Sequence, residues 1–386
     1  MAKVNLKLLQ ICAAYKPAFI YGGPTMSVSM LSEQLSKAGY DLQVYTTTAN
    51  GTEELNTSPN KLTNVDGVQV TYFKRITKDH THFSPALLKV LWKNVKAYDV
   101  VHIHAWWNLV SLFSCLIALT RGVPVVVSPR GTLSNYSFHN KNNLAKAFIH
   151  YLLGKPMLNK CHLHVTSALE YNAVSAMLKP KSINNLPNFV KLPAASYTVI
   201  NNSSSPFKLL FLSRIEEKKG LDILIKTLPL LNFQYMLTIV GDGDENYINE
   251  LKALAYKYKA EENINWVGFQ TDHKFKLLQE QDLLVLPSHD ENFGNVVIES
   301  LSVGTAVLVS KFVGLANYVI DKNMGWQCNP DEVSLGTTLN HIAGNSNDLK
   351  QIRLNAPSII RADFDESALT KRYADMYKNI IINGRL

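Results

Sequence analysis

Short apolar runs alternate along the chain with segments in which apolar residues recur every three or four positions. In the first half, the runs rich in Val, Ile and Leu predict strands at 6–12, 42–46, 68–73, 99–104, 124–128 and 163–166. The intervening segments predict helices at 24–38, 84–97, 108–120, 141–158 and 168–178. Strands that alternate with helices are typical of parallel β-α-β architecture.

The same pattern restarts in the second half. It predicts strands at 208–213, 236–240, 264–267, 283–287 and 306–310, and helices near 220–230, 245–259, 272–280, 295–303, 346–356 and 366–382. Between the halves, the polar run NNSSSP at 201–206 carries no apolar side chain to bury and predicts a surface linker. We therefore predict one domain at 1–200, a second at 206–365, and a last helix at 366–386 that crosses back to the first domain.

Both halves have the pattern of a doubly wound α/β domain. Ligands of such domains bind beyond the carboxyl ends of the parallel strands. We expect the two domains to face each other and to leave a cleft there.

The composition supports a folded protein that is not secreted. Of 386 residues, 46% are hydrophobic and 18% are charged, which excludes global disorder. The four cysteines lie far apart without a CxxC pair, as expected of reduced thiols in a cytosol. The lysine-containing start MAKVNLKLLQICAAY predicts a buried strand rather than a secretion signal. The longest apolar stretch, 109–119, is too short to span a bilayer, so we expect a cytoplasmic protein.

Basic residues are concentrated in the first half. Residues 1–195 carry 20 Lys and Arg against 8 Asp and Glu, a net charge of +12, whereas the remainder carries 19 against 23, a net charge of −4. A basic domain attracts anionic partners, but a solubilising surface accounts equally well for the excess. No nucleic-acid-binding motif is present, which leaves a phospholipid surface or a phosphate-bearing acceptor. The basic, amphipathic stretch 144–158 suits peripheral contact with the inner face of an anionic membrane, or an ordinary core helix.

Two glycines precede the first predicted helix. Gly22 and Gly23 stand in the sequence YGGP, whose proline suits the first turn of a helix. Glycines let a backbone approach a ligand closely, and a helix N-terminus offers free N–H groups to an anion or a sugar hydroxyl. A simple connecting turn would use the same residues.

The first strand of the second half leads into the sequence SRIEEKKG. Arg214 and Lys219 then lie at the carboxyl end of that strand. A guanidinium can grip a phosphate through two N–H bonds, and an ammonium adds a point charge. Together they could neutralise a diphosphate leaving group, although the two glutamates between them also fit a solvated charged loop.

The sequence DENFGNVVIE follows the apolar run LLVLPS. Glu291 is placed in a loop, and Glu299 lies about one turn inside the helix that Asn295 begins. One carboxylate could accept hydrogen bonds from the hydroxyls of a donor sugar and the other from a ribose. The alternative for Glu299 is an exposed position at the edge of a helix.

In this order and spacing, several motifs resemble those of the family 4 retaining glycosyltransferases, which have the GT-B fold. They are GGP, HIHAWW, SPRGTLS, HVTSALE, LPNFV, SRIEEKKG, VGDGDE, WVGF and ENFGNVVIES. Glu291 and Glu299 match the Glu-x7-Glu signature of that family without a gap. The resemblance implies an α/β protein of GT-B fold with two facing Rossmann-like, doubly wound domains and an interdomain cleft.

The resemblance also implies an activity: transfer of a hexosyl group, with retention and without metal, from a nucleotide-diphosphate sugar to a glycan or polyprenyl-diphosphate-linked acceptor. Such enzymes use no cofactor beyond the donor, and no Asp-x-Asp pair falls in a loop suited to a metal. The implied setting is cell-surface polysaccharide synthesis. The implied catalytic residues are Arg214, Lys219 and Glu291. The implied donor-binding residues are Gly22, Gly23, Val267, Gly268, Asn292, Phe293, Gly294, Asn295 and Glu299.

One position departs from the family pattern. Many relatives carry a histidine in the loop where this chain reads SPRGT, so Arg130 stands in its place, as in a subgroup with a PRG loop. A guanidinium cannot act as a base at neutral pH, but it could bind an acceptor anion or the leaving phosphate. A purely structural arginine is the alternative.

Two His-x-His pairs, at 102/104 and 162/164, each place two imidazoles on one face of a strand. A zinc site needs further ligands, and none is evident, so we expect no metal. We expect His104, at the end of its strand, on the acceptor side.

Other functions fit less well. A nucleotide-sugar epimerase of GT-B fold would need acid and base carboxylates near Arg130. A dehydrogenase would need GxGxxG at the first turn. A non-enzymatic, two-domain ligand-binding protein would gain nothing from Arg214 and Lys219 together.

Overall fold

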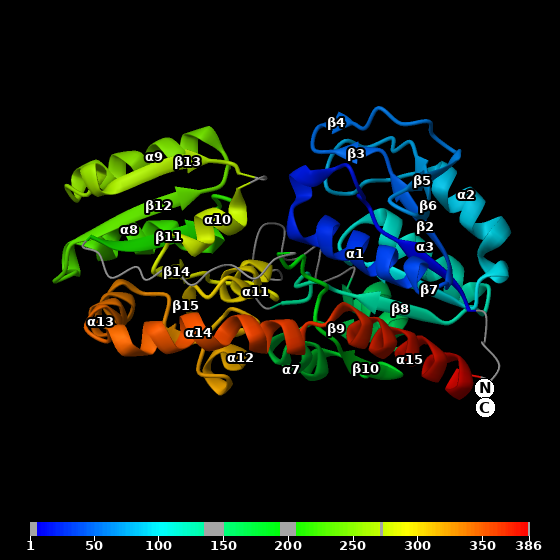
Figure 1. The fold of residues 1–386 in the computed structure, drawn as a ribbon. Helices are drawn as coiled ribbons and strands as arrows, with labels where there is room; N and C mark the ends of the chain where they lie inside the picture. Colours follow the sequence, from blue (N-terminus) through cyan, green and yellow to red (C-terminus); the bar gives the residue numbers. More distant parts are fainter. Residues whose placement is uncertain (1–5, 135–149, 194–205, 271–272, 385–386) are drawn as a thin grey trace. The chain divides into compact units, whose positions relative to one another are not determined.

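The computed structural model describes residues 6–134, 150–193, 206–270 and 273–384. Its contacts divide the chain into two compact units, shown in Figure 1. The N-terminal domain comprises Met1–Phe189 together with Asp365–Leu386, and the C-terminal domain comprises Val190–Phe364. Val190 packs in the core of the C-terminal domain, so the division falls ahead of the polar run at 201–206. Of that run, only Pro206 lies within the described residues.

The N-terminal domain is built on an eight-stranded sheet with the order β10-β9-β8-β7-β1-β2-β6-β5. Its strands are β1 (Lys7–Ile11), β2 (Asp41–Thr47), β5 (Leu62–Val65), β6 (Val68–Phe73), β7 (Val100–His104), β8 (Val125–Ser128), β9 (His162–Val165) and β10 (Ser182–Asn185). All neighbours are parallel except β5, which runs antiparallel to β6 at the edge. The two-residue strands β3 (Ala49–Asn50) and β4 (Glu53–Glu54) pair separately.

The helices of this domain are α1 (Gly23–Lys37), α2 (Pro85–Asn94), α3 (Leu109–Thr120), α6 (Lys155–Leu158), α7 (Ala168–Met177) and α15 (Glu366–Gly384). Single turns lie at Phe19–Tyr21 (η1), Val95–Ala97 (η2) and His150–Gly154 (η3). Residues 135–149, and with them the first half of the predicted helix at 141–158, lie outside the described residues.

The two faces of the N-terminal sheet differ in polarity. On one face, Leu9, Val101 and Val127 join a wholly apolar cluster. On the other, apolar residues such as Leu8 and Val100 lie toward the amino ends of the strands. Toward their carboxyl ends, this second face carries the buried polar residues Gln10, His102, His104, Ser128 and His164. Alternation of side chains along a strand produces this division, since every second residue shares a face.

The last helix, α15, belongs to the N-terminal domain. It packs against α1 (Figure 1) and buries Leu369, Tyr373, Met376 and Tyr377 in the cluster on the polar-edged face. The amide of Gln34 in α1 donates to the carboxylate of Glu366 at 2.7 Å.

The C-terminal domain contains a six-stranded, fully parallel sheet with the order β13-β12-β11-β14-β15-β16. The strands are β11 (Phe207–Leu212), β12 (Tyr235–Val240), β13 (Ile264–Gly268), β14 (Leu283–Leu286), β15 (Ala306–Ser310) and β16 (Gly325–Cys328). The α-helices are α8 (Leu221–Thr227), α9 (Glu245–Lys257), α10 (Lys274–Gln279), α11 (Asn295–Ser302), α12 (Ala316–Asp321), α13 (Glu332–Ala343) and α14 (Ser346–Asp363). Single 3-10 turns lie at Glu217–Lys219 (η4), Leu228–Leu230 (η5) and Glu261–Asn263 (η6).

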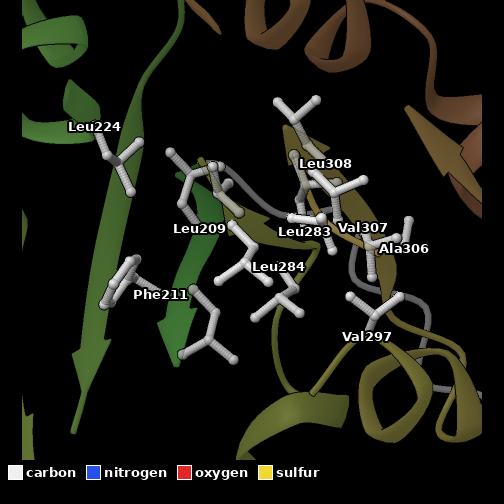
Figure 2. Packing of buried hydrophobic residues seen from close by; sticks show 14 of the residues in the cluster. Leu209, Phe211, Leu224, Leu283, Leu284, Val297, Ala306, Val307 and Leu308 are labelled. Carbon is white, nitrogen blue, oxygen red and sulfur yellow. The ribbon is translucent and has the colours of Figure 1, made fainter. Parts of the chain in front are cut away.

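The central strands of this sheet are buried on both faces. Figure 2 shows Leu209 and Phe211 of β11 with Leu283 and Leu284 of β14, packed beside Val307 of β15. These strands are continuous apolar runs because helices cover both faces of the sheet. The predicted α/β class with two doubly wound domains is confirmed.

Several elements differ from the prediction. We expected the first strand to lead directly into the YGGP turn, but it ends at Ile11, and the turn follows only after a loop and the turn η1. The pattern did not indicate β5, β10, β16, α12 or α13. In the part of the chain that the structure describes, no helix combines the length and the apolarity needed to cross a membrane.

Candidate active site

The strand order of the C-terminal sheet reverses at β11. The chain proceeds from β11 outward to β12 and β13 on one side, then returns to β14 on the other. In open α/β sheets, such a reversal leaves room for a ligand beyond the carboxyl ends of the two central strands. The loops that follow β11 and β14 carry Lys219 and Glu291.

Those two loops are bonded to each other. The backbone N–H of His289 donates to the carbonyl of Lys218 at 2.8 Å. Gly220, with φ of +72°, lies so close to the second loop that an added Cβ would stand 2.3 Å from the carbonyl oxygen of Pro287. A larger residue would force the loops apart, so Gly220 fixes the spacing behind Lys219.

Lys219 and Glu291 form an ion pair across the reversal point. The Nζ of Lys219 contacts the Oε2 of Glu291, and the lysine side chain is only 7% exposed. The backbone of Glu291 is held as well, since its N–H donates to the carbonyl of Phe312 at 3.1 Å and its carbonyl accepts from Gly314 at 2.7 Å. The pair is therefore rigidly placed.

The surroundings keep Glu291 ionised. Burial alone would raise its pKa, but the charge and hydrogen bond of Lys219, with the charges of Lys218 and Arg214, lower the pKa below its ordinary value. A carboxylate held ionised in this way can accept hydrogen bonds from sugar hydroxyls. It is poorly suited to act as a general acid.

Arg214 lies at the start of the same loop but does not join the Lys219–Glu291 pair. Its side chain is 47% exposed, and Nη1 lies 2.6 Å from a carboxylate oxygen of Glu216. The loop after β12 holds the backbone next to Arg214 in place, because the N–H of Ile215 donates to the carbonyl of Asp242 at 2.8 Å.

Two glycines in the motif VGDGDE make this support possible. A Cβ added at Gly241 would lie 1.8 Å from the carbonyl oxygen of Ser213, and one at Gly243 would lie 2.2 Å from that of Ile215. Two acidic residues of the motif accept hydrogen bonds from nearby backbone N–H groups. Asp242 accepts from the N–H of Gly243, and Asp244 caps α9 through the N–H groups of Asn246 and Tyr247.

The loop after β14 continues into α11. Phe293 is buried, and Gly294 adopts φ of +92° immediately before the helix. The partly exposed residues Asn292 and Asn295 flank them. The first N–H groups of a helix have no partner within the helix, so this turn can present donors to a ligand.

Glu299 forms a second ion pair one turn into α11. Its Oε1 lies 2.6 Å from the Nζ of Lys274 in α10, and its side chain is 12% exposed. The alternative of an exposed glutamate at the edge of a helix is therefore wrong. At the opposite edge of the sheet, Val267 and Gly268 end β13, and Gly268 accepts from the N–H of Gly241 at 3.0 Å.

The candidate residues of the N-terminal domain form a separate group. Gly22 caps α1 with φ of +63°, and Gly23 is the first residue of that helix. No atom would lie within 4 Å of a Cβ added at Gly22, so its backbone conformation, rather than close packing, calls for glycine.

Arg130 follows β8 and contacts three different segments. It donates from Nη1 to the hydroxyl of Ser27 at 2.7 Å and to the amide oxygen of Asn188 at 3.2 Å. Its Nε donates to the Nδ1 of His104 at 3.2 Å. His104, expected on the acceptor side, is buried, and its Nε2 bonds Gln10 at 2.5 Å. Both of its ring nitrogens are thus occupied inside the domain.

The sequence motifs predicted some residues of the candidate site and missed others. Lys274 was missed because nothing in the spacing of a lysine on α10 marks it as the partner of Glu299. Asn188 lies in the motif LPNFV, to which no role had been given. Among the described residues, no group of three or more His, Cys, Asp or Glu side chains is arranged to hold a metal ion.

Two family models match this chain, each over one domain. The model of "Glycosyltransferase Family 4" matches residues 21–192, and that of "Glycosyl transferases group 1" matches residues 198–357. With the fold and the loops at the reversal point, these matches define a GT-B glycosyltransferase. The chain belongs to the glycosyltransferases, with an N-terminal domain of the family 4 type and a C-terminal domain of group 1.

Individual relatives agree with this assignment. A glycogen synthase of Mycobacterium tuberculosis is 24% identical to this chain, and the alignment covers 96% of this chain and 94% of the glycogen synthase. The amylovoran biosynthesis glycosyltransferase AmsK of Erwinia amylovora is 25% identical over 45% of each chain. The structure of Anabaena HepE in complex with UDP-glucose is similar in fold, with a TM-score of 0.72 and 20% identity, covering 97% of this chain and 100% of that one.

Proposed function

We propose that this glycosyltransferase moves a hexosyl group, with retention and without metal, from a nucleotide-diphosphate sugar to a glycan or polyprenyl-diphosphate-linked acceptor. The observation that carries the proposal is the Lys219–Glu291 pair at the reversal point of the C-terminal sheet. Relatives whose names refer to glycogen and amylovoran support a role in polysaccharide synthesis, and we propose that the product is a cell-surface polysaccharide.

In this proposal, Lys219 and Arg214 bind the diphosphate of the donor. The acceptor oxygen bonds to the anomeric carbon while the bond from that carbon to the phosphate oxygen breaks. The electron pair of the broken bond passes to the diphosphate, which takes up the proton of the acceptor hydroxyl. A fixed ammonium in a site with little water stabilises that developing charge more than water does. Lys219 carries three N–H donors, so it can keep its bond to Glu291 while it binds a phosphate oxygen.

The acidic residues bind the uncharged parts of the donor. Glu291, held ionised, accepts hydrogen bonds from hydroxyls of the transferred sugar, and the turn at Phe293 and Gly294 offers N–H groups beside it. Glu299 accepts from the ribose, while the strand end at Val267 and Gly268 contacts the base. Asn292 and Asn295 complete the donor loop. In the N-terminal domain, Gly22 and Gly23 offer close backbone approach and helix N–H groups to a ligand, and the acceptor binds on the side of Arg130.

The donor and the chemistry can be tested together. The full chain is screened by thermal shift against UDP, GDP, ADP and their common hexose conjugates, because a ligand that binds the folded form raises Tm. Turnover with the best donor is then measured with polyprenyl-diphosphate-linked saccharides and with soluble glycans, in the presence of EDTA. NMR of the product gives the anomeric configuration. A requirement for metal, or an inverted product, would contradict the proposed chemistry.

We also propose a cytoplasmic enzyme that makes peripheral contact with an anionic membrane. The described part of the stretch 144–158 supports this, because Tyr151, Leu152 and Leu153 are 69%, 60% and 48% exposed and Lys155 lies beside them. Apolar side chains flanked by lysines suit the interface of an anionic bilayer. The test is co-sedimentation with liposomes of neutral or anionic lipid. Binding that does not depend on lipid charge would contradict the proposal.

A further inference from the structure

The hydrogen-bond partners of the Arg130 guanidinium carry no negative charge. Among the described residues, no carboxylate lies within ion-pair distance of its guanidinium, and its three recorded acceptors, on Ser27, Asn188 and His104, are all neutral. These bonds occupy Nε and Nη1, whereas Nη2 has no acceptor among the residues that the structure describes. A half-buried cation that donates only to neutral groups keeps an uncompensated charge in a partly desolvated site, which indicates a ligand of opposite charge.

The backbone holds Arg130 in an unusual conformation. Its φ is +54°, a region that non-glycine residues seldom occupy and that costs about 1–2 kcal/mol. The loop is braced from α7, where the Oε1 of Glu170 accepts from the N–H of Gly131 at 2.8 Å. Strain of this kind persists only where neighbouring contacts enforce it.

Behind Arg130 lies a chain of buried hydrogen bonds whose direction can be derived. A guanidinium can only donate, so the Nδ1 of His104 must accept, and the proton of this imidazole must be on Nε2. That Nε2 then donates to the Oε1 of Gln10 at 2.5 Å. The amide nitrogen of Gln10 in turn donates to the hydroxyl of Tyr377 at 3.1 Å.

The same direction continues across the sheet. The Tyr377 hydroxyl, having accepted from Gln10, donates to the Nδ1 of His102 at 2.7 Å. The Nε2 of His102 donates to the hydroxyl of Ser128 at 2.6 Å, which donates to the Nδ1 of His164 at 2.6 Å. The Nε2 of His164 lies 3.0 Å from the carbonyl oxygen of Leu186. Each hydrogen bond in this chain has only one possible donor, and the donors follow one another from the guanidinium of Arg130 to the carbonyl of Leu186.

This chain requires all three imidazoles to be neutral, since each uses one nitrogen as an acceptor. Burial supports that state, because it lowers the pKa of His102 and His104 well below the ordinary value and that of His164 to about 3. The groups bonded to Arg130 therefore orient the guanidinium without neutralising its charge, while the carboxylate of Glu170, which forms no ion pair with it, stabilises the charge through space.

We propose that Arg130 is a preoriented phosphate-binding residue of the N-terminal domain, and that His104, Gln10 and Tyr377 position it. The inference rests on the proposed function, in which both substrates carry phosphate: the donor as a nucleoside diphosphate and the acceptor as a polyprenyl diphosphate. Nη2 is the nitrogen that meets the phosphate. The last helix contributes to binding through the Tyr377 hydroxyl, without touching the ligand.

Arginine side-chain NMR tests this in the full chain, which contains only eight arginines. The Nε–H signal of Arg130 is assigned by its loss in Arg130→Lys, and that of Arg214 by its loss in Arg214→Lys. Inorganic pyrophosphate is then titrated into the wild type. We expect the Arg130 signal to shift and to saturate. If the Arg130 signal stays fixed while the Arg214 signal shifts, the inference fails and the proposed donor site stands. If the Arg130 signal shifts while the Arg214 signal stays fixed, only the proposed donor site is contradicted.

Two further titrations distinguish the sources of the phosphate. UDP carries the diphosphate of a donor, and farnesyl diphosphate carries that of a lipid-linked acceptor. A shift of the Arg130 signal with farnesyl diphosphate alone assigns Arg130 to the acceptor, and a shift with UDP alone assigns it to the donor. No shift with either ligand would overturn the role in substrate binding.

The positioning role has a matched pair of variants on one helix. Tyr377→Phe removes the hydroxyl that joins Gln10 to His102. Tyr373→Phe removes an equally buried hydroxyl beside His164, which still has the carbonyl of Leu186. We expect Tyr377→Phe to weaken pyrophosphate binding at Arg130 about tenfold, equivalent to one hydrogen bond, and Tyr373→Phe to leave it within about twofold. Equal effects of both variants, or none from Tyr377→Phe, would refute the positioning role.

Discussion

The ammonium of Lys219 contacts the carboxylate of Glu291 across the two central strands of the C-terminal sheet, at the point where the strand order reverses. Each residue fixes the other: the lysine keeps the carboxyl ionised, and the carboxylate holds the ammonium in place. The pair is thus already formed before any substrate arrives, and the first prediction below depends on it.

Lys219→Ala should abolish most turnover while the protein stays folded. Loss of one preorganised donor to a developing oxyanion lowers kcat by about 100- to 1,000-fold. Lys218→Ala is the matched control, because Lys218 is the neighbouring residue and its Nζ lies 3.6 Å from Glu216. Initial rates and far-UV circular dichroism check both variants. Near-normal kcat in Lys219→Ala would remove Lys219 from the catalytic group.

Glu299→Ala should raise the KM for the donor about tenfold or more, since a carboxylate that accepts from ribose contributes about 1.5–3 kcal/mol to binding. Lys274→Ala should produce a smaller increase, because it leaves Glu299 in place but unoriented. Lys276→Ala, on the exposed side of the same helix, is the control. Isothermal titration with the nucleoside diphosphate separates binding from turnover. An unchanged affinity in Glu299→Ala would rule out the ribose contact.

Gly243→Ala should destabilise the C-terminal domain and displace the loop that carries Arg214. The added Cβ would stand 2.2 Å from the carbonyl oxygen of Ile215, and overpacking of this kind costs about 1–3 kcal/mol. Gly67→Ala meets no atom within 4 Å and should cost only the strain of its positive φ. Urea denaturation compares the two variants. A Gly243→Ala protein as stable as the wild type would show that the loop can shift freely.

The N-terminal domain should lose stability as the pH falls below about 6.5. Burial lowers the pKa of five of its histidines, to about 4 for His82 and His162 and to about 3 for His164, with His102 and His104 also well below the ordinary value. Between those values and 6.5, the unfolded chain binds protons that the folded chain excludes. The free energy of unfolding therefore falls with decreasing pH, by up to about 1.4 kcal/mol per pH unit for each histidine.

Tryptophan fluorescence can follow this domain alone once Trp266 and Trp326 of the C-terminal domain are replaced by Phe. Urea denaturation is then measured from pH 7.5 to pH 5.0. A free energy of unfolding that stays constant over this interval would mean that the histidines are not held neutral.

Much of the fold was predictable because buried parallel strands are continuous apolar runs. The sequences of β11, β12, β14 and β15 have this character, whereas β10, with the sequence SINN, and β16, with GWQC, do not. Edge strands bury less surface and can therefore be polar, so hydrophobicity does not reveal them.

The candidate site was predictable to the extent that its residues lie in local motifs. Lys219, Glu291 and Glu299 stand out by sequence and spacing alone. The contact between Gln10 and Tyr377 joins residues 367 positions apart, which no local pattern can indicate. The histidine pairs were visible, but their neutral, directed hydrogen bonds follow only from the side chains that surround them.

The placement of α15 also affects how the protein is synthesised. Strands β1 and β7 leave the ribosome early, yet the hydroxyl that satisfies Gln10 and His102 is translated after the whole of Val190–Phe364. Until then, Gln10 and His102 of the nascent N-terminal sheet lack their partner on α15, whereas all residues of the C-terminal domain have already been translated. The N-terminal domain can therefore be completed only after its last helix has been translated.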